Sequence, residues 1–277
     1  MTEIAVVTDS SADIAPEKAR ALGIREVPVT AYVGRDPSPV FCTPASFWRA
    51  VAECGGPVRV AQPTPGDFYN TYRGILREAQ SDVAILSIHA AGGLSGTLHA
   101  AHLAAEMLGG AGVKVIDSGL IGPPLGQVVT ETAALVGGDH SREEIVDLVY
   151  SILSRIRVMV YAHDPERLTA SGSGGWLQSL SRAATRPFRP SMYSLREGEM
   201  IPAGRCSGAD EVRARFIQFI GEAKRPGFVG IMSAGEDCGG GELKENLDPA
   251  VEVEEFIIGP VLGAHLGPGS LGVFTID

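Results

Sequence analysis

The sequence has few of the residues that mark disulfide-rich and metal-binding proteins. Only four of its 277 residues are cysteine, namely Cys42, Cys54, Cys206 and Cys238. They lie far apart, without a CxxC pair and without the paired Cys/His spacing of a zinc site. We therefore expect reduced thiols, no disulfide framework and no bound metal.

Positive charge and long hydrophobic runs are also scarce. The formal net charge is −10, and the basic residues are scattered, so a phosphate backbone has little to bind and a nucleic-acid partner is disfavoured. The most apolar segments, residues 120–136 and 256–262, are interrupted by polar residues, glycine or proline, which argues against an integral membrane protein. The N-terminal residues MTEIAVVTDSSAD lack the basic start and apolar run of a signal peptide, and we expect a cytoplasmic protein.

The common nucleotide and hydrolase motifs are absent. There is no GxxxxGK[ST] sequence, and the pair Gly92-Gly93 lacks the GxGxxG spacing, so no nucleotide cofactor is expected. Ser233 lies in a GIMSAG segment after a predicted strand, but Ile231 stands where a nucleophile elbow requires glycine. A serine-dependent hydrolase stays open as an alternative.

The first half of the chain repeats a short apolar run, a polar turn and a helical pattern. This order is typical of strand–loop–helix units in a largely parallel sheet, here a Rossmann-like α/β domain. The predicted strands are Ile4–Val7, Arg25–Tyr32, Val58–Ala61, Val83–Ile88 and Val113–Ile116. Helix starts are indicated by Thr43-Pro44, by Thr64-Pro65 and by the capping box that begins at Ser141.

The second half has a different pattern, which predicts an α+β domain with a mixed or antiparallel sheet. A hairpin signal, Glu197-Gly198, separates two short strand candidates, and a helical stretch covers Asp210–Lys224. The predicted strands are Val158–Tyr161, Ser191–Leu195, Met200–Pro202, Phe228–Met232, Val251–Ile257 and Leu271–Ile276. We expect two α/β domains, residues 1–157 and 158–277.

Hydroxyl-bearing turns follow several strands of the first half. In an open parallel sheet such turns meet at the carboxyl edge, where ligands bind. The most informative turn is GGLSGT, because its glycines let a ligand approach the backbone while Ser95, Gly96 and Thr97 lie at a helix start that favours an anion. The alternative for Ser95 is a helix cap, which is compatible with ligand binding.

The histidines give weaker signals. His99 and His102 are one helical turn apart, but no acidic residue completes a metal pattern, and we expect both on a helix surface. His265 lies in the segment GPVLGAHLGPG, which predicts a tight loop before the last strand. An imidazole in such a loop is either structural or directed at a site.

Five segments, in this order along the chain, resemble the DegV family. They are Val7–Asp13, Gln62–Phe68, Leu86–Ile88 with Leu94–Thr97, Val115–Ser118 and Gly259–Gly269. The resemblance implies two α/β domains with a long-chain fatty acid buried between them, and a protein that binds rather than converts its ligand. It also implies a separate kinase that forms an acyl phosphate from the bound fatty acid.

The resemblance further assigns site residues. Ser95 would hydrogen-bond the fatty-acid carboxylate, with Gly96, Thr97 and Thr64 beside it and His265 in the surrounding polar network.

The chain also departs from the family pattern near the expected head group. Val60 stands where the family has threonine, and Trp176 stands where it has arginine. A further arginine that the family often exposes is not found near Ser207. Because a long acyl chain contributes on the order of 10 kcal/mol at about 0.8 kcal/mol per methylene, a lipid ligand is still expected after such losses.

The alternatives are an enzyme and a sensor. The enzyme would be a hydrolase that uses Ser95 or Ser233, or a phosphotransferase-like protein. The sensor would bind a small molecule with a different head group.

Overall fold

The computed structural model describes residues 3–34, 43–79, 82–110, 112–136, 138, 140–164, 191–223, 226–235 and 238–277. The chain divides into two compact units. Unit 1 contains residues 1–30 and 60–154, and unit 2 contains residues 31–59 and 155–277. The sequence predicted one boundary near residue 157, whereas the segment 31–59 groups with the second half of the chain.

Unit 1 is built on a parallel four-stranded sheet with the strand order β2-β1-β5-β6. Its strands are β1 (Glu3–Asp9), β2 (Arg25–Val27), β5 (Val83–His89) and β6 (Val113–Asp117). Every residue of β5 is buried, as expected for a central strand covered on both faces. The predicted parallel sheet is confirmed, and the predicted turns after β1, β5 and β6 lie at its carboxyl edge.

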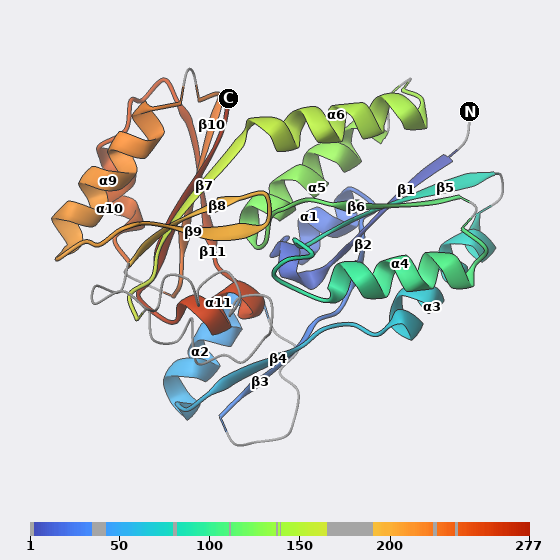
Figure 1. Cartoon of the computed structure of the whole chain (residues 1–277), viewed down its shortest axis with the longest axis horizontal. Helices are drawn as coiled ribbons and strands as arrows, with labels where there is room; N and C mark the ends of the chain where they lie inside the picture. Colours follow the sequence, from blue (N-terminus) through green and yellow to red (C-terminus); the bar gives the residue numbers. More distant parts are fainter. Residues whose placement is uncertain are drawn as a thin grey trace. The chain divides into compact units, whose positions relative to one another are not determined.

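Helices cover both faces of this sheet (Figure 1). The helices are α1 (Pro16–Ala21), α3 (Pro65–Glu78), α4 (Thr97–Met107), α5 (Pro123–Val136) and α6 (Arg142–Arg155), with a short 3-10 helix η1 (Ser10–Ala12) after β1. Helices α3 and α4 pack on one face through a cluster that includes Phe68, Tyr72 and Ile85. On the other face α5 contacts β1 and η1. The capping box at Ser141 is confirmed, because Ser141 and Glu144 exchange hydrogen bonds at the start of α6.

Two strand predictions for the first half are corrected. The run Arg25–Tyr32 is broken into β2 and β3 (Thr30–Val33), since Pro28 between them has no N–H for a ladder. Strand β4 (Val58–Ala61) forms, but it pairs with β3 in a separate two-stranded sheet and not in the parallel sheet.

Unit 2 contains a mixed six-stranded sheet with the strand order β11-β10-β12-β7-β8-β9. Its strands are β7 (Ile156–Tyr161), β8 (Met192–Arg196), β9 (Glu199–Gly204), β10 (Phe228–Ser233), β11 (Glu252–Ile257) and β12 (Leu271–Ile276). Strands β10 and β11 are parallel and the other neighbours are antiparallel. The predicted hairpin turn has positive φ at both Glu197 and Gly198, as a two-residue type I′ turn requires. The predicted mixed sheet is confirmed.

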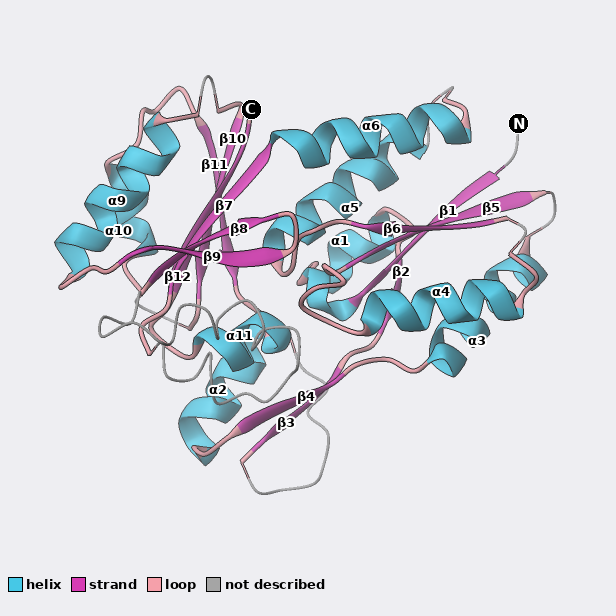
Figure 2. Cartoon of the chain, viewed as in Figure 1, coloured by secondary structure: helices cyan, strands magenta, loops and turns pink. Residues whose placement is uncertain are grey.

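Helices α9 (Ala209–Gly221) and α10 (Gly240–Glu245) pack on one face of this sheet (Figure 2). The sequence predicted α9 but not the six-residue α10.

The segment around His265 corrects another prediction. It is a helix, α11 (Pro260–Leu266), and not a tight loop. Pro260 occupies its first turn and Gly267 follows its last residue, the positions where a helix favours proline and glycine. Helix α11 packs on α2 (Pro44–Cys54), where a Cβ at Gly263 would lie 2.7 Å from a ring carbon of Trp48.

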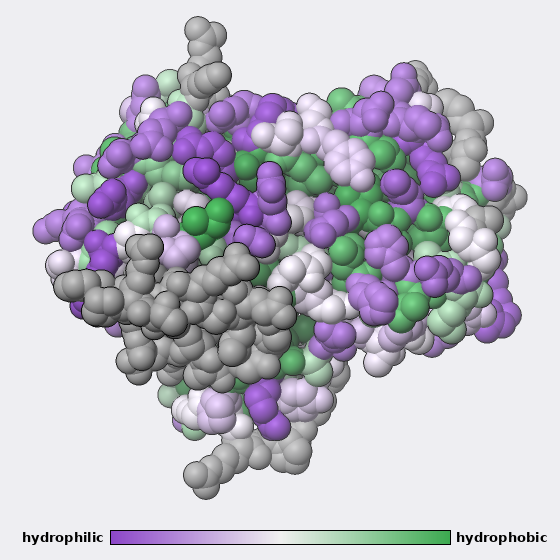
Figure 3. Space-filling model, in the orientation of Figure 1, coloured by the Kyte–Doolittle hydropathy of each residue, from purple (hydrophilic) through white to green (hydrophobic). Residues whose placement is uncertain are grey.

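The surface combines polar side chains with scattered apolar ones (Figure 3). Large apolar side chains that are exposed include Met107 and Tyr150 in unit 1 and Ile257 in unit 2. Within the described ranges, no helix has the length and apolar character needed to cross a bilayer.

Candidate functional site

The turn between β5 and α4 brings Ser95, Gly96 and Thr97 together at the carboxyl edge of the parallel sheet. The amides of Leu94 and Ser95 donate to the carbonyl oxygen of Ala91, at 2.9 and 3.0 Å, which closes the turn. Ser95 Oγ accepts from the Thr97 amide at 3.2 Å and lies 2.8 Å from Thr97 Oγ1. Ser95 is half-buried and Thr97 is buried. Ser95 therefore caps the helix start locally and also keeps an accessible edge.

Gln62 lies directly against this turn, although the site prediction did not include it. A Cβ at Gly96 would lie 2.6 Å from Gln62 Nε2, so a larger residue there would require the flexible Gln62 side chain to shift. The glycine between Ser95 and Thr97 permits such a close approach, but it does not identify the neighbour in the sequence. The turn after β4 and the turn before α4 thus place the Gln62 amide against Gly96, the residue that follows Ser95.

Asp117 at the end of β6 holds two glycine amides, one in the turn before α4 and one in the turn after β6. Its carboxylate accepts from the amide of Gly92 at 3.2 Å and from the amide of Gly119 at 2.9 Å. Both turns at this edge are therefore held by one carboxylate. The two amide donors stabilise the charged form of this side chain.

Two other predicted residues have different surroundings. Thr64 is the N-cap of α3 in a capping box, where its hydroxyl donates to Asp67 Oδ2 at 2.7 Å and accepts from the Asp67 amide at 3.3 Å. That arrangement is a structural use of the hydroxyl. Val60 is half-buried in β4. Trp176 lies outside the described residues.

His265 is buried in α11, with 5% of its surface exposed. Burial lowers the pKa of its imidazole from 6.5 to about 4, so the ring is neutral at pH 7. A neutral imidazole still donates one hydrogen bond and accepts another. His265 and Ser95 belong to different units, and their predicted proximity stays a prediction.

The surface histidines and the thiols can be placed directly. His99 and His102 are exposed on α4, which confirms the helix-surface interpretation. Cys54, Cys206 and Cys238 are free thiols in the described part of the chain. No group of three or more His, Cys, Asp or Glu side chains there could hold a metal ion.

Unit 2 has a hollow of about 1270 Å³ at the carboxyl ends of β7 and β10. Its lining includes Ser233, the other serine considered as a nucleophile, together with Tyr161, His163 and the two cysteines Cys206 and Cys238. Among the described residues, no hydrogen bond joins the Ser233 hydroxyl to an imidazole. In the described part of the chain, Ser233 is therefore not paired with a base, although His163 lines the same hollow.

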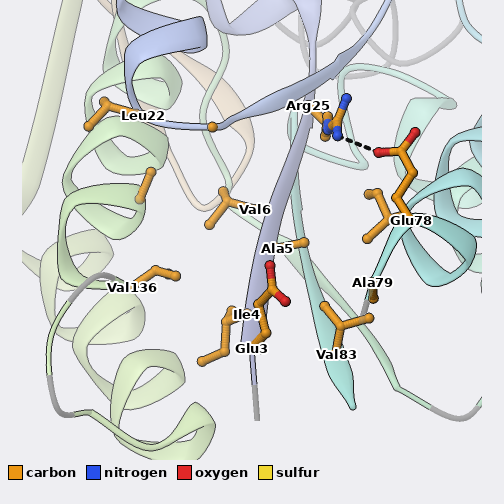
Figure 4. A pocket seen from close by; sticks show the side chains of 13 residues that line it. Glu3, Ile4, Ala5, Val6, Leu22, Arg25, Glu78, Ala79, Val83 and Val136 are labelled. Carbon is orange, nitrogen blue, oxygen red and sulfur yellow. Dashed lines mark hydrogen bonds and ion pairs between the residues drawn. The ribbon is translucent and has the colours of Figure 1, made fainter. Parts of the chain in front are cut away.

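A second hollow, of about 690 Å³, lies in unit 1 at the amino ends of β1 and β5 (Figure 4). Aliphatic side chains such as Ile4, Val6 and Val136 line it, and Arg25 at its rim is paired with Glu78 at 2.7 Å. None of the predicted site residues lines it, and it lies at the edge of the sheet opposite to the Ser95 turn. It is therefore not the predicted ligand site.

A buried polar chain in unit 1 was missed by the sequence analysis. His89 Nδ1 lies 2.8 Å from Asp9 Oδ2, and His89 Nε2 lies 2.6 Å from Ser87 Oγ. Ser87 Oγ in turn lies 2.8 Å from the hydroxyl of Tyr72. Asp9, His89 and Ser87 are adjacent only because β1 and β5 pair, so their spacing along the chain gives no local motif.

Comparison with known proteins identifies relatives over the full length of the chain. The model of the DegV family, described as uncharacterised proteins, matches residues 3–277. A DegV domain-containing protein of Halalkalibacterium halodurans is 27% identical, over 99% of this chain and 98% of its own.

Solved structures agree with this assignment. A DegV family protein of Thermus thermophilus, described in terms of fatty-acid binding, superposes with a TM-score of 0.84 at 26% identity, covering 100% of both chains. DegV of Bacillus subtilis, described as a fatty acid binding protein, superposes with a TM-score of 0.85 at 23% identity, again over 100% of both chains. The family resemblance inferred from the five sequence segments is confirmed, and the chain belongs to the DegV family.

Proposed function

We propose that this protein binds a long-chain fatty acid and holds its carboxylate at the Ser95–Thr97 turn. The observation that carries the proposal is the match to the Thermus thermophilus protein, which extends over both whole chains and whose description is fatty-acid binding. The geometry of unit 1 supports it, because glycines, a helix start and the half-buried Ser95 hydroxyl meet at the carboxyl edge of a parallel sheet.

The same geometry favours binding over catalysis. Ser95 Oγ hydrogen-bonds to Thr97, and in the described part of the chain it has no imidazole partner. A serine nucleophile requires a base within hydrogen-bond reach and a group that orients this base. We therefore propose a cytoplasmic carrier without catalytic residues of its own.

A kinase partner is the finer part of the proposal and rests on the family resemblance alone. Such a kinase would transfer the γ-phosphoryl group of ATP to a carboxylate oxygen, giving an acyl phosphate and ADP. Candidate kinases from the source organism, incubated with the loaded protein and ATP, would release ADP in proportion to acyl phosphate only if this part is correct. ADP release that is independent of the loaded protein would contradict it.

The first test is Ser95→Ala, which we expect to weaken fatty-acid binding about tenfold. The variant removes one charge-assisted hydrogen bond to the carboxylate, which contributes roughly 1.5 kcal/mol. Displacement of a fluorescent fatty acid by palmitate measures the affinity, and far-ultraviolet circular dichroism checks the fold. Ser154→Ala, on an exposed residue near the end of α6, is the matched control and should bind as the wild type does. Unchanged affinity of a folded Ser95→Ala variant would exclude Ser95 as the carboxylate ligand.

A second test uses the departures from the family at Val60 and Trp176. Apolar side chains there leave a bound carboxylate less well solvated than threonine and arginine would, so a neutral head group should be tolerated better. We expect Val60→Thr combined with Trp176→Arg to increase the preference for palmitate over methyl palmitate. Competition binding at pH 7, scored as a ratio of affinities, cancels changes in acyl-chain packing.

The control for this double variant is Val115→Thr, the same exchange at a partly buried position of β6. It should leave the ratio unchanged. If the double variant also leaves the ratio unchanged or reverses it, Val60 and Trp176 do not contact the head group.

A further inference from the structure

The polar chain in unit 1 has the geometry of a nucleophile, a base and an orienting acid. The Ser87 hydroxyl, the His89 ring and the Asp9 carboxylate are joined by contacts of 2.6 and 2.8 Å. All three side chains are buried with no exposed surface. This order of serine, histidine and aspartate is the one that activates serine in hydrolases.

The surroundings of Ser87 are inconsistent with such a reaction. Its hydroxyl is already 2.8 Å from Tyr72 Oη, and the ring of Phe68 packs edge-on against His89 with centroids 4.9 Å apart. Tyr72 and Phe68 are themselves fully buried. Neither of the two hollows described above is lined by Ser87, and its side chain has no exposed surface, so its oxygen is not accessible to a substrate in this conformation.

Asp9 and His89, two members of this buried polar chain, are hydrogen-bonded instead to the turns of the carboxyl edge. Asp9 Oδ1 accepts from the amide of Ser11 at 3.1 Å and also from the Ser11 hydroxyl, which fixes the turn after β1. The carbonyl oxygen of His89 accepts from Ser118 Oγ at 2.7 Å, which fixes the turn after β6. Two residues beyond His89, the carbonyl oxygen of Ala91 accepts from the amide of Ser95 at 3.0 Å.

A buried network of polar side chains is a costly way to stabilise a core, since apolar side chains of similar volume often do at least as well. Buried polar groups can instead select one arrangement of the backbone, because any other arrangement leaves them without partners. The side chains of this buried polar network come from α3, β5, β1 and η1. Only one relative placement of these four elements therefore satisfies all of the hydrogen bonds in the network.

We propose that Asp9, His89 and Ser87 form a positioning unit that holds the Ser95 turn in the geometry needed for a carboxylate, and that they are not a catalytic triad. The proposal rests on the function proposed above. Loss of one member should loosen the turns at the carboxyl edge and weaken binding of the head group, while the contribution of the acyl chain stays the same.

The test compares Ser87→Ala and Tyr72→Phe with the control Thr132→Val. Thr132 is equally buried in unit 1. Its hydroxyl donates to the Val128 carbonyl oxygen at 2.7 Å inside α5 and is not part of the buried polar network. We expect Ser87→Ala to lower the affinity for palmitate about fivefold, the size of coupling seen within one hydrogen-bond network, and Tyr72→Phe to lower it less. Binding of methyl palmitate should change less than twofold in both, and Thr132→Val should change neither affinity.

A second measurement separates this proposal from the proposed function. Hydrogen exchange of the peptide that covers Ala91–Thr97 should be faster in Ser87→Ala than in Thr132→Val, whether or not any fatty acid binds. If the wild type binds no fatty acid, the proposed function fails, and the exchange result alone decides on positioning. Equal exchange in the two variants would overturn the positioning role. Labelling of Ser87 by a fluorophosphonate, lost in Ser87→Ala, would also overturn it, because the serine would then be an accessible nucleophile.

Discussion

Replacing Glu26 with glutamine is expected to raise the free energy of unfolding at pH 8 by up to about 3 kcal/mol. Burial, and to a smaller extent the charge of Asp9, raises the pKa of the Glu26 carboxyl from 4.5 to about 7. At about 1.4 kcal/mol per pKa unit this shift is an upper limit, because solvent reaches the half-buried side chain on the short strand β2.

The sign follows from proton binding. Between pH 4.5 and 7 the folded protein holds a proton on Glu26 that the unfolded chain has released, so the stability falls as the pH rises through this range. Below pH 4.5 both states are protonated and the full stability is present. Glutamine cannot ionise, and the variant should lose this pH dependence.

Urea unfolding of the wild type and Glu26→Gln at pH 4 and pH 8 measures the difference. The two proteins should have similar stability at pH 4, and the variant should be more stable at pH 8. Glu3→Gln, on an exposed residue of β1, is the matched control and should change little at either pH. An equal gain for Glu26→Gln at both pH values would show that hydrogen bonding of the new amide, and not the buried charge, is responsible.

Gly126→Ala is expected to destabilise unit 1 by roughly 1–3 kcal/mol, even though alanine is the better helix former. A Cβ at Gly126 in α5 would overlap the carbonyl oxygen of Ala12 and would lie 3.2 Å from Ile14 Cγ1. The oxygen belongs to the backbone of the turn after β1, so it cannot move aside as a side chain would. The cost of overpacking should exceed the gain of about 1 kcal/mol in helix propensity.

Gly74→Ala provides a matched control for this prediction. Gly74 lies in α3 of the same unit, and a Cβ there would have no neighbour within 4 Å. We expect this variant to be more stable than the wild type by up to about 1 kcal/mol. Thermal and urea unfolding of both variants give the comparison, and a stabilised Gly126→Ala would mean that α5 does not approach η1 as closely as described.

The elements with a strong local pattern could be predicted from the sequence. Val83–Ile88 and Phe228–Met232 are mostly apolar runs, and both form interior strands of their sheets. The run Arg25–Tyr32 was taken as one strand because its residues favour β structure on both sides of Pro28. Helices α10 and α11 were missed because helices of six and seven residues are too short to show helical periodicity, and both contain glycine.

In the candidate site, too, only the residues with a local sequence signal could be predicted. Ser95 and Thr97 were found because a turn rich in glycine and hydroxyl groups precedes a helix, which is a local signal. The contact of Gln62 with Gly96 joins positions 34 residues apart in the numbering, and the contact of Asp9 with His89 joins positions 80 apart. Such neighbours follow from strand order and register, which a single sequence does not specify.

Mass spectrometry of an organic extract from the purified protein tests the central claim most directly. If the protein is a fatty-acid carrier, the extract should contain long-chain fatty acid at close to one molecule per chain, because an acyl chain buried at about 0.8 kcal/mol per methylene stays bound during purification. Delipidated protein incubated with palmitate should regain the same stoichiometry. An extract without fatty acid, together with no uptake of palmitate by the folded, delipidated protein, would contradict the proposed function.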